Sequence, residues 1–61
     1  MKFTVRQLRL LNGLSIKDLA NMLEINTLTY SQKEGGKTRF YIDEAYKIAE
    51  MFDKNINDIL W

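Results

Sequence analysis

The sequence contains no cysteine, no histidine and no proline, and only three glycines among its 61 residues. Without cysteine there is neither a disulfide framework nor a thiolate nucleophile. Without histidine the chain lacks the usual general base and the commonest protein ligand for metal ions. No phosphate-binding loop appears either, so we expect no enzyme activity, no catalytic residue, no metal, no cofactor and no small-molecule ligand. The scarcity of helix-breaking residues favours an all-α chain.

Long apolar runs are also missing. None approaches the roughly 18 residues that a membrane-spanning helix needs. The N-terminal segment is interrupted by Arg6, Gln7 and Arg9, which argues against a signal peptide. We therefore expect a cytoplasmic protein without membrane contact. The chain is short enough to form one domain, residues 1–61, and a core of this size would gain stability from a second copy or a partner.

Charge is unevenly distributed although the net charge is only +1. Residues 1–17 carry basic side chains and no acidic ones, whereas residues 40–61 are mainly acidic. The sequence therefore predicts a basic and an acidic surface, unless the fold mixes them.

Five short helices are predicted, at about residues 5–11, 16–23, 27–33, 42–52 and 56–60. The spacing of Thr4 with Gln7 and of Ser15 with Asp18 is typical of capping boxes. Asn26 and Asn55 are the expected N-caps of the third and fifth helices. The apolar residues of the fourth helix cover roughly 220°, whereas one core-facing stripe needs roughly 100°. That helix is therefore either central in the fold or in contact with another chain.

The second and third helices are joined by a very short turn. Ala20 allows a close helix crossing, and Leu23, Ile25 and Tyr30 are spaced to fill the angle between the two helices. This arrangement is typical of a helix-turn-helix, whose second helix enters the major groove of DNA. An ordinary small helical bundle has the same local features, and spacing alone leaves both interpretations open.

From about residue 5 to residue 60 the chain resembles the Cro/cI-like (XRE) helix-turn-helix family of phage and bacterial transcriptional regulators. The resemblance depends on the order and spacing of "LRLLNGLSIKDLA", "EGGK" and "EAYKIAEMFDKNINDIL". It implies a compact five-helix, lambda-repressor-like DNA-binding domain in which the third helix reads DNA.

The same resemblance implies which residues meet DNA. By position, the base-reading side chains are Thr27, Leu28 and Gln32; a glutamine can bond adenine through two hydrogen bonds, and an apolar side chain can pack on the thymine methyl. The third helix has a single basic residue and no arginine, so its phosphate contacts are expected to come largely from elsewhere. The predicted phosphate-binding residues are Arg9, Lys17, Thr29, Ser31, Lys33, Gly35, Gly36, Lys37, Thr38 and Arg39. For each of them, an ordinary solvated surface position is the alternative.

The chain departs from the family pattern at several positions. Ile16 stands where a phosphate-binding glutamine is usual, Glu24 where glycine is usual and Lys33 where an apolar residue is usual. Phe40 and Tyr41 replace a proline and a serine or threonine. These departures lower the DNA affinity that we expect and leave the expected fold unchanged.

Two functions remain as alternatives. The first is a sequence-specific DNA-binding regulator that binds its operator as a homodimer, with Phe40, Met51, Leu60 and Trp61 as the predicted dimer interface. The second is a protein-interaction modulator or antirepressor of the same fold, with weak DNA affinity and another repressor protein as its partner.

Overall fold

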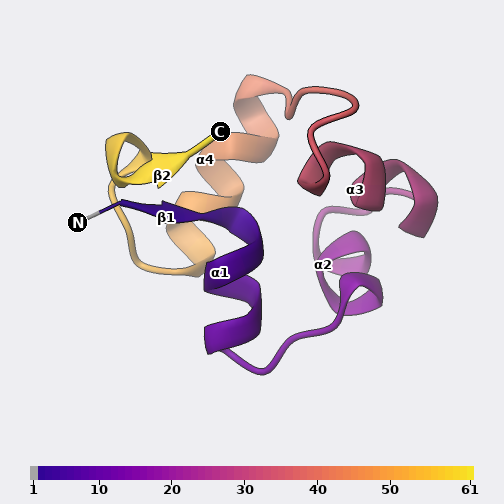
Figure 1. Cartoon of the computed structure of the whole chain (residues 1–61), viewed down its shortest axis with the longest axis horizontal. Helices are drawn as coiled ribbons and strands as arrows, with labels where there is room; N and C mark the ends of the chain where they lie inside the picture. Colours follow the sequence, from indigo (N-terminus) through magenta and orange to yellow (C-terminus); the bar gives the residue numbers. More distant parts are fainter. Residues whose placement is uncertain (1) are drawn as a thin grey trace.

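The computed structural model describes residues 2–61 as a small, mainly helical domain (Figure 1). In that range the helical elements are four α-helices and one 3-10 turn, and two short strands complete the fold. No helix in the described part of the chain has the length and apolar character needed to span a bilayer. The elements are β1 (Phe3–Thr4), α1 (Val5–Leu11), α2 (Ile16–Met22), α3 (Thr27–Glu34), α4 (Ile42–Met51), the 3-10 turn η1 (Ile56–Asp58) and β2 (Ile59–Leu60).

The helices begin where the sequence predicted. At α1 the Thr4 hydroxyl accepts a hydrogen bond from the Gln7 N–H, and the Gln7 side chain accepts one from the Thr4 N–H. Ser15 and Asp18 form the same reciprocal pair at α2. The Asn26 side chain caps α3 by accepting from the Leu28 N–H. These bonds satisfy N–H groups that a helix start otherwise leaves without partners.

The prediction of a fifth helix over residues 56–60 was wrong. Only Ile56–Asp58 form a 3-10 turn, and the backbone is then extended. The extended segment pairs in parallel with the start of the chain, Phe3 opposite Ile59 and Thr4 opposite Leu60. This pairing supplies the hydrogen bonds that a further helical turn would have supplied.

The core lies between α1, α4 and the α2–α3 pair (Figure 1). Its largest fully buried side chains are Leu19, Tyr30 and Ile48. Ala20 is also fully buried, as a close crossing of α2 and α3 requires. The predicted helix-turn-helix packing is therefore present.

The turn between α2 and α3 contains a non-glycine residue in the left-handed region. Glu24 has φ 58°, at the position where the family pattern has glycine. Gly13, after α1, has φ 68°, a conformation that glycine adopts freely. Asp53, after α4, has φ 52°, which the sequence did not indicate.

Candidate nucleic-acid interface

The start of α3 is at the surface. Tyr30 fixes the inner side of this helix because its side chain is fully buried. On the outer side Thr27 is exposed, Leu28 is 66% exposed and Gln32 is half-buried. The three residues predicted to read bases are therefore placed where a groove could be reached, and base reading itself stays a prediction.

The loop after α3, residues 35–41, is exposed from Gly35 to Arg39. Its first part is held by the end of the helix, because the Gln32 carbonyl accepts hydrogen bonds from the N–H groups of Lys37 at 2.9 Å and Thr38 at 3.4 Å. The side chains of these two residues and of Arg39 remain at the surface, next to α3 in the chain. They are the part of the predicted phosphate-binding set that this loop supplies.

The backbone N–H groups of the two loop glycines were expected to bond phosphate, but in the structure they bond carbonyl groups of α3. The Gly35 N–H donates to the Ser31 carbonyl at 2.9 Å, and the Gly36 N–H donates to the Lys33 carbonyl at 3.3 Å. Both groups therefore close the C-terminus of α3, as helix-terminating residues commonly do. Because these N–H groups already have partners, their predicted role in phosphate binding is corrected.

Arg9 is also corrected as a phosphate-binding residue, because it is only 7% exposed. Its Nε and one terminal nitrogen donate to the two carboxylate oxygens of Glu34, at 2.8 and 3.0 Å. Its other terminal nitrogen donates to the Leu14 carbonyl at 2.9 Å. The guanidinium thus ties α1 to the end of α3 inside the protein.

The Arg9–Glu34 pair belongs to a small polar network. The Tyr30 hydroxyl donates to the same Glu34 carboxylate at 2.5 Å. Burial opposes the charged form of Glu34, but the hydrogen bonds from Arg9 and Tyr30 outweigh it, so the pKa of this carboxyl lies below its ordinary value. Burial, with the hydrogen bond to Glu34, raises the pKa of Tyr30. The hydrogen bond to Glu34 raises the pKa of Arg9 despite burial.

Lys33 is the second basic residue that the structure removes from the predicted DNA surface. It is 7% exposed, and its Nζ donates to Glu44 Oε1 at 2.5 Å. The ammonium lies over the Tyr41 ring, 3.8 Å from the ring centroid. The pair connects α3 to α4 at a position where an apolar residue is usual. The apolar residue that is usual at this position was the one feature of the sequence that indicated burial of residue 33.

Of the five predicted basic side chains, Lys17, Lys37 and Arg39 are exposed. The hydroxyl residues Thr29 and Ser31 are exposed on α3 as well. Glu24 is exposed in the turn before α3, where its carboxylate opposes the approach of phosphate.

The predicted dimer residues fall into two groups. Phe40 and Met51 are half-buried against the core, and the Phe40 ring lies 6.1 Å from Tyr30 and 5.6 Å from Trp61, centroid to centroid. Leu60 and Trp61 are about half exposed, at 49% and 51%. The structure therefore places only the second pair on an accessible apolar surface.

Two further apolar residues on α4 were not singled out as interface residues. Ile42 is 69% exposed and Tyr46 is 59% exposed. Together with Trp61 they border a shallow groove of about 410 Å³ between α4 and the C-terminal segment. The sequence signal for them was the apolar arc of the fourth helix, which is wider than a core face needs. We name Ile42, Tyr46 and Trp61 the α4 face; Leu60 borders a separate hollow on the other side of the C-terminal segment.

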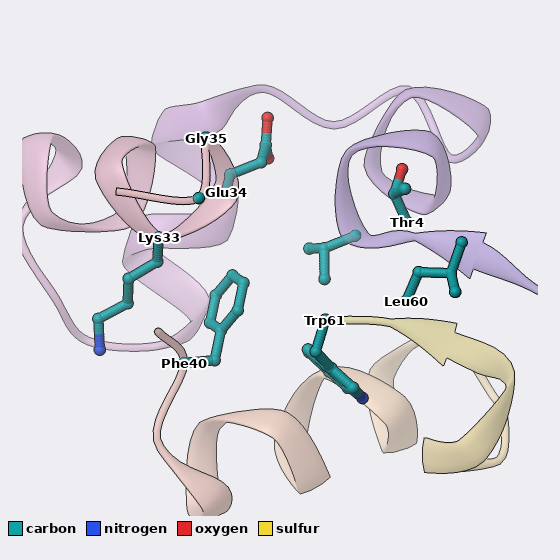
Figure 2. A pocket seen from close by; sticks show the side chains of 9 residues that line it. Thr4, Lys33, Glu34, Gly35, Phe40, Leu60 and Trp61 are labelled. Atoms are coloured by element: carbon teal, nitrogen blue, oxygen red, sulfur yellow. The ribbon is translucent and has the colours of Figure 1, made fainter. Parts of the chain in front are cut away.

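A second hollow, of about 260 Å³, lies behind the end of α3 (Figure 2). Its charged lining residues are Lys33 and Glu34, and both are already engaged in ion pairs. No group of three or more acidic, histidine or cysteine side chains in residues 2–61 is arranged to hold a metal ion. The hollow is lined by Thr4, Val5, Lys33, Glu34, Gly35, Gly36, Phe40, Leu60 and Trp61.

Comparison with known proteins identifies the family. A family model described as "Helix-turn-helix" matches residues 5–59, which is nearly the whole chain. No curated protein and no solved structure matches this chain. The matched range contains α2, the turn and α3 as well as the helices that pack behind them. The chain belongs to the Cro/cI-type (XRE) helix-turn-helix family, whose members are DNA-binding domains and typically not enzymes.

Proposed function

We propose that this protein is a sequence-specific transcriptional regulator that places α3 in the major groove of an operator. The observation that carries the proposal is the two-sided character of α3. Tyr30 anchors its inner side in the core, and Thr27 and Leu28 are exposed at its N-terminal end. Recognition helices of this class contact base edges with their N-terminal residues.

In this proposal the affinity comes mainly from cations outside α3. Lys17, Lys37 and Arg39 contact phosphates on either side of the groove, and the hydroxyls of Thr29 and Ser31 add neutral contacts. Each neutralised phosphate contributes about 0.9 to the slope of log affinity against log salt. Three contacts in one copy therefore correspond to a slope of about −3, and two copies to about −5.

The operator is proposed to be bound by a homodimer, with the α4 face as the interface between the copies. Two copies related by a two-fold axis would place their α3 helices about 34 Å apart, on a roughly palindromic site. The exposure of Ile42 and Tyr46 supports this interface, because the packing of the monomer leaves them uncovered.

A salt titration tests the proposal. DNA binding by the full chain is measured by fluorescence anisotropy, first with a random-sequence duplex pool and then with the duplexes selected from it, between 50 and 200 mM salt. We expect selection of a common sequence and a slope near the values above. Selected duplexes that bind no better than random ones would contradict sequence-specific reading, and an affinity independent of salt would contradict phosphate binding.

One specific observation favours a second function, a protein-interaction modulator such as an antirepressor. Arg9 and Lys33 are used inside the protein, and the exposed Glu24 carboxylate precedes α3, so the cationic surface is smaller than the sequence suggested. The α4 face would then bind another repressor protein instead of a second copy. The absence of salt-dependent DNA binding in the same titration would favour this alternative.

A further inference from the structure

We propose that the buried Lys33–Glu44 pair is a positioning device for the loop 35–41, which carries Lys37, Thr38 and Arg39. Lys33 and Glu44 would not touch DNA themselves. They would set the distance of the loop from the DNA backbone by joining the helix before it to the helix after it. This inference rests on the DNA-binding function proposed above and adds residues that the family resemblance does not supply.

A single oxygen atom connects the two ends of the loop. Glu44 Oε1 accepts from Lys33 Nζ, near the end of α3, at 2.5 Å. It also accepts from the Tyr41 N–H, immediately before α4, at 2.8 Å. The Tyr41 ring covers the Lys33 ammonium, 3.8 Å from its centroid, and this contact adds a cation–π interaction to the same junction. Any movement of Tyr41, at the end of the loop, relative to the α3 terminus must therefore disturb this junction.

Part of the space behind the loop is open, although Phe40 near its end packs against the core. The hollow of about 260 Å³ lies between the end of α3, Phe40 and the C-terminal segment (Figure 2). In Figure 2 the Lys33 side chain points away from this hollow, whereas the Phe40 ring borders it. Because part of the space behind the loop is not filled, the anchors at its two ends have a large share in fixing its position.

Stability alone is a poor explanation for this pair. Replacing a buried ion pair by well-packed apolar residues is often neutral or stabilising, because both charges must be stripped of water. An apolar side chain at residue 33 would serve the core equally well. The hydrogen bond from the Tyr41 N–H to Glu44 is the capping bond of α4 and would remain, but an apolar side chain would not bond Glu44 and would not tie α3 to α4. The arrangement therefore fits orientation better than stabilisation.

The test uses the double variant Lys33→Met/Glu44→Gln in the full chain. It removes one positive and one negative charge, so the net charge stays at +1. Glutamine keeps an oxygen that can accept from the Tyr41 N–H, and no uncompensated charge remains buried. We expect a melting temperature within about 5 °C of the wild type. The heteronuclear NOE of the Gly36–Arg39 amides is expected to fall while that of the α3 amides stays unchanged.

In DNA binding we expect the double variant to lose about tenfold in affinity and the salt slope to become shallower by about one, as phosphate contacts are lost. The preferred operator sequence is expected to stay the same, because α3 is not altered. Lys33→Arg should retain the ion pair and the contact with Tyr41, and should therefore bind like the wild type. The matched control is Lys47→Met/Glu50→Gln, which makes the same two replacements at exposed positions of α4 and should change neither loop nor affinity.

Three results would overturn the proposal. An unchanged NOE in the loop of the double variant would show that the pair does not position it. A mobile loop with unchanged affinity would show that its position is irrelevant to binding. Wild-type protein without salt-dependent DNA binding would remove the proposed function, and the NOE measurement, which needs no DNA, would still decide whether the pair anchors the loop.

Discussion

At the scale of single residues, the side chains of Glu34 and Arg9 each take part in three hydrogen bonds. The Glu34 carboxylate accepts from the guanidinium of Arg9 and from the hydroxyl of Tyr30. The side chains of the ion pair are 8% and 6% exposed, so water does little to support either charge. Removing one partner would leave the other charge buried without compensation, and this loss exceeds the value of an ordinary hydrogen bond.

We therefore predict that Glu34→Gln destabilises the domain by about 3 kcal/mol or more, because Arg9 stays charged and buried. A core of this size supplies only about 3–5 kcal/mol, so a large fraction of the variant should be unfolded at 25 °C. Urea denaturation followed by circular dichroism measures the change. Glu50→Gln, the same replacement at an exposed position, is the control and should stay within about 0.5 kcal/mol. Equal stabilities of the two variants would contradict this account of the network.

The pH dependence of stability is expected to follow Glu34. Its pKa is lower in the folded protein than the ordinary value of 4.5, because the hydrogen bonds from Arg9 and Tyr30 outweigh burial. Its contribution to stability is therefore complete above pH 4.5 and is lost as the pH falls from there through the folded pKa. Asp18, whose pKa is lowered mainly by its hydrogen bond with the Ser15 backbone, acts in the same direction.

Urea midpoints measured at several pH values between 7 and 2 test this expectation. Stability should decline below about pH 4.5 in the wild type and also in Asp18→Asn, because the Glu34 network remains. An Asp18→Asn variant with no acid-dependent decline would assign the effect to the helix cap instead.

A substitution at Glu24 is expected to increase the stability of the folded domain. A side chain in the left-handed region costs roughly 1–2 kcal/mol, whereas glycine adopts that region freely. Glycine also makes the unfolded chain more flexible, which offsets part of the gain. We expect Glu24→Gly to stabilise the domain by about 0.5 kcal/mol, as measured by thermal denaturation. Asn21→Gly, inside α2, should be destabilising instead. A loss of stability in Glu24→Gly would show that the Glu24 side chain compensates for its backbone.

At the scale of elements, the sequence predicted what short-range interactions decide. The capping boxes at Thr4 and Ser15 involve partners three residues away, so their spacing is visible in the sequence. The pairing of β1 with β2 is different, because it joins residues from the two ends of the domain. Residues 56–60, which were predicted as a fifth helix, therefore form a 3-10 turn and a strand. No local pattern in residues 56–60 contains that information.

In the candidate site, too, the sequence predicted some features and missed those that depend on contacts between distant residues. The exposed start of α3 was predicted, because the resemblance to the family places Thr27 and Leu28 there by position. The burial of Arg9 was not, because its partner Glu34 lies 25 positions away. A basic residue on a predicted helix is equally compatible with solvent, DNA or an internal carboxylate until the packing of the helices is known.

Substitutions of a base-reading residue in α3 and of a phosphate-binding residue in the loop after it are expected to have different effects on DNA binding. Gln32→Ala should change which bases are preferred at one operator position, because a bidentate contact contributes about 1–3 kcal/mol of discrimination. Lys37→Ala should weaken binding to all sequences by a similar factor and reduce the salt slope by about 1. Selection from a random duplex pool and anisotropy titrations measure the two effects. Lys47→Ala, on the exposed side of α4, is the charge-matched control for Lys37.

Identical operator preferences in the wild type and in Gln32→Ala would contradict the assignment of Gln32 as a base reader. If Lys37→Ala behaved like Lys47→Ala, the loop would not contact the DNA backbone.

At the scale of the whole molecule, the α4 face is one of the apolar surfaces that the packing of one copy leaves exposed, as is the surface of Leu10 and Leu11 on α1. We expect Tyr46→Asp to raise the dissociation constant of the proposed dimer at least tenfold, because a two-fold interface would bury the unpaired carboxylate of both copies. Sedimentation equilibrium over a range of concentrations measures the change. Leu11→Asp, at a leucine of α1 that is 72% exposed, is the control and should leave association unaltered. Dimers of equal strength in both variants would place the interface elsewhere.

The parallel pairing of Phe3–Thr4 with Ile59–Leu60 brings residues from both ends of the domain together. Because the strands are parallel, a linker from residue 61 to residue 2 would have to pass back along the strand pair, and the circularised chain could then be reopened at the turn that contains Gly13. The permuted protein would begin with α2 and α3, so the helix-turn-helix would leave the ribosome first. In natural order, by contrast, the strand pair cannot form until residues 59–60 have been synthesised.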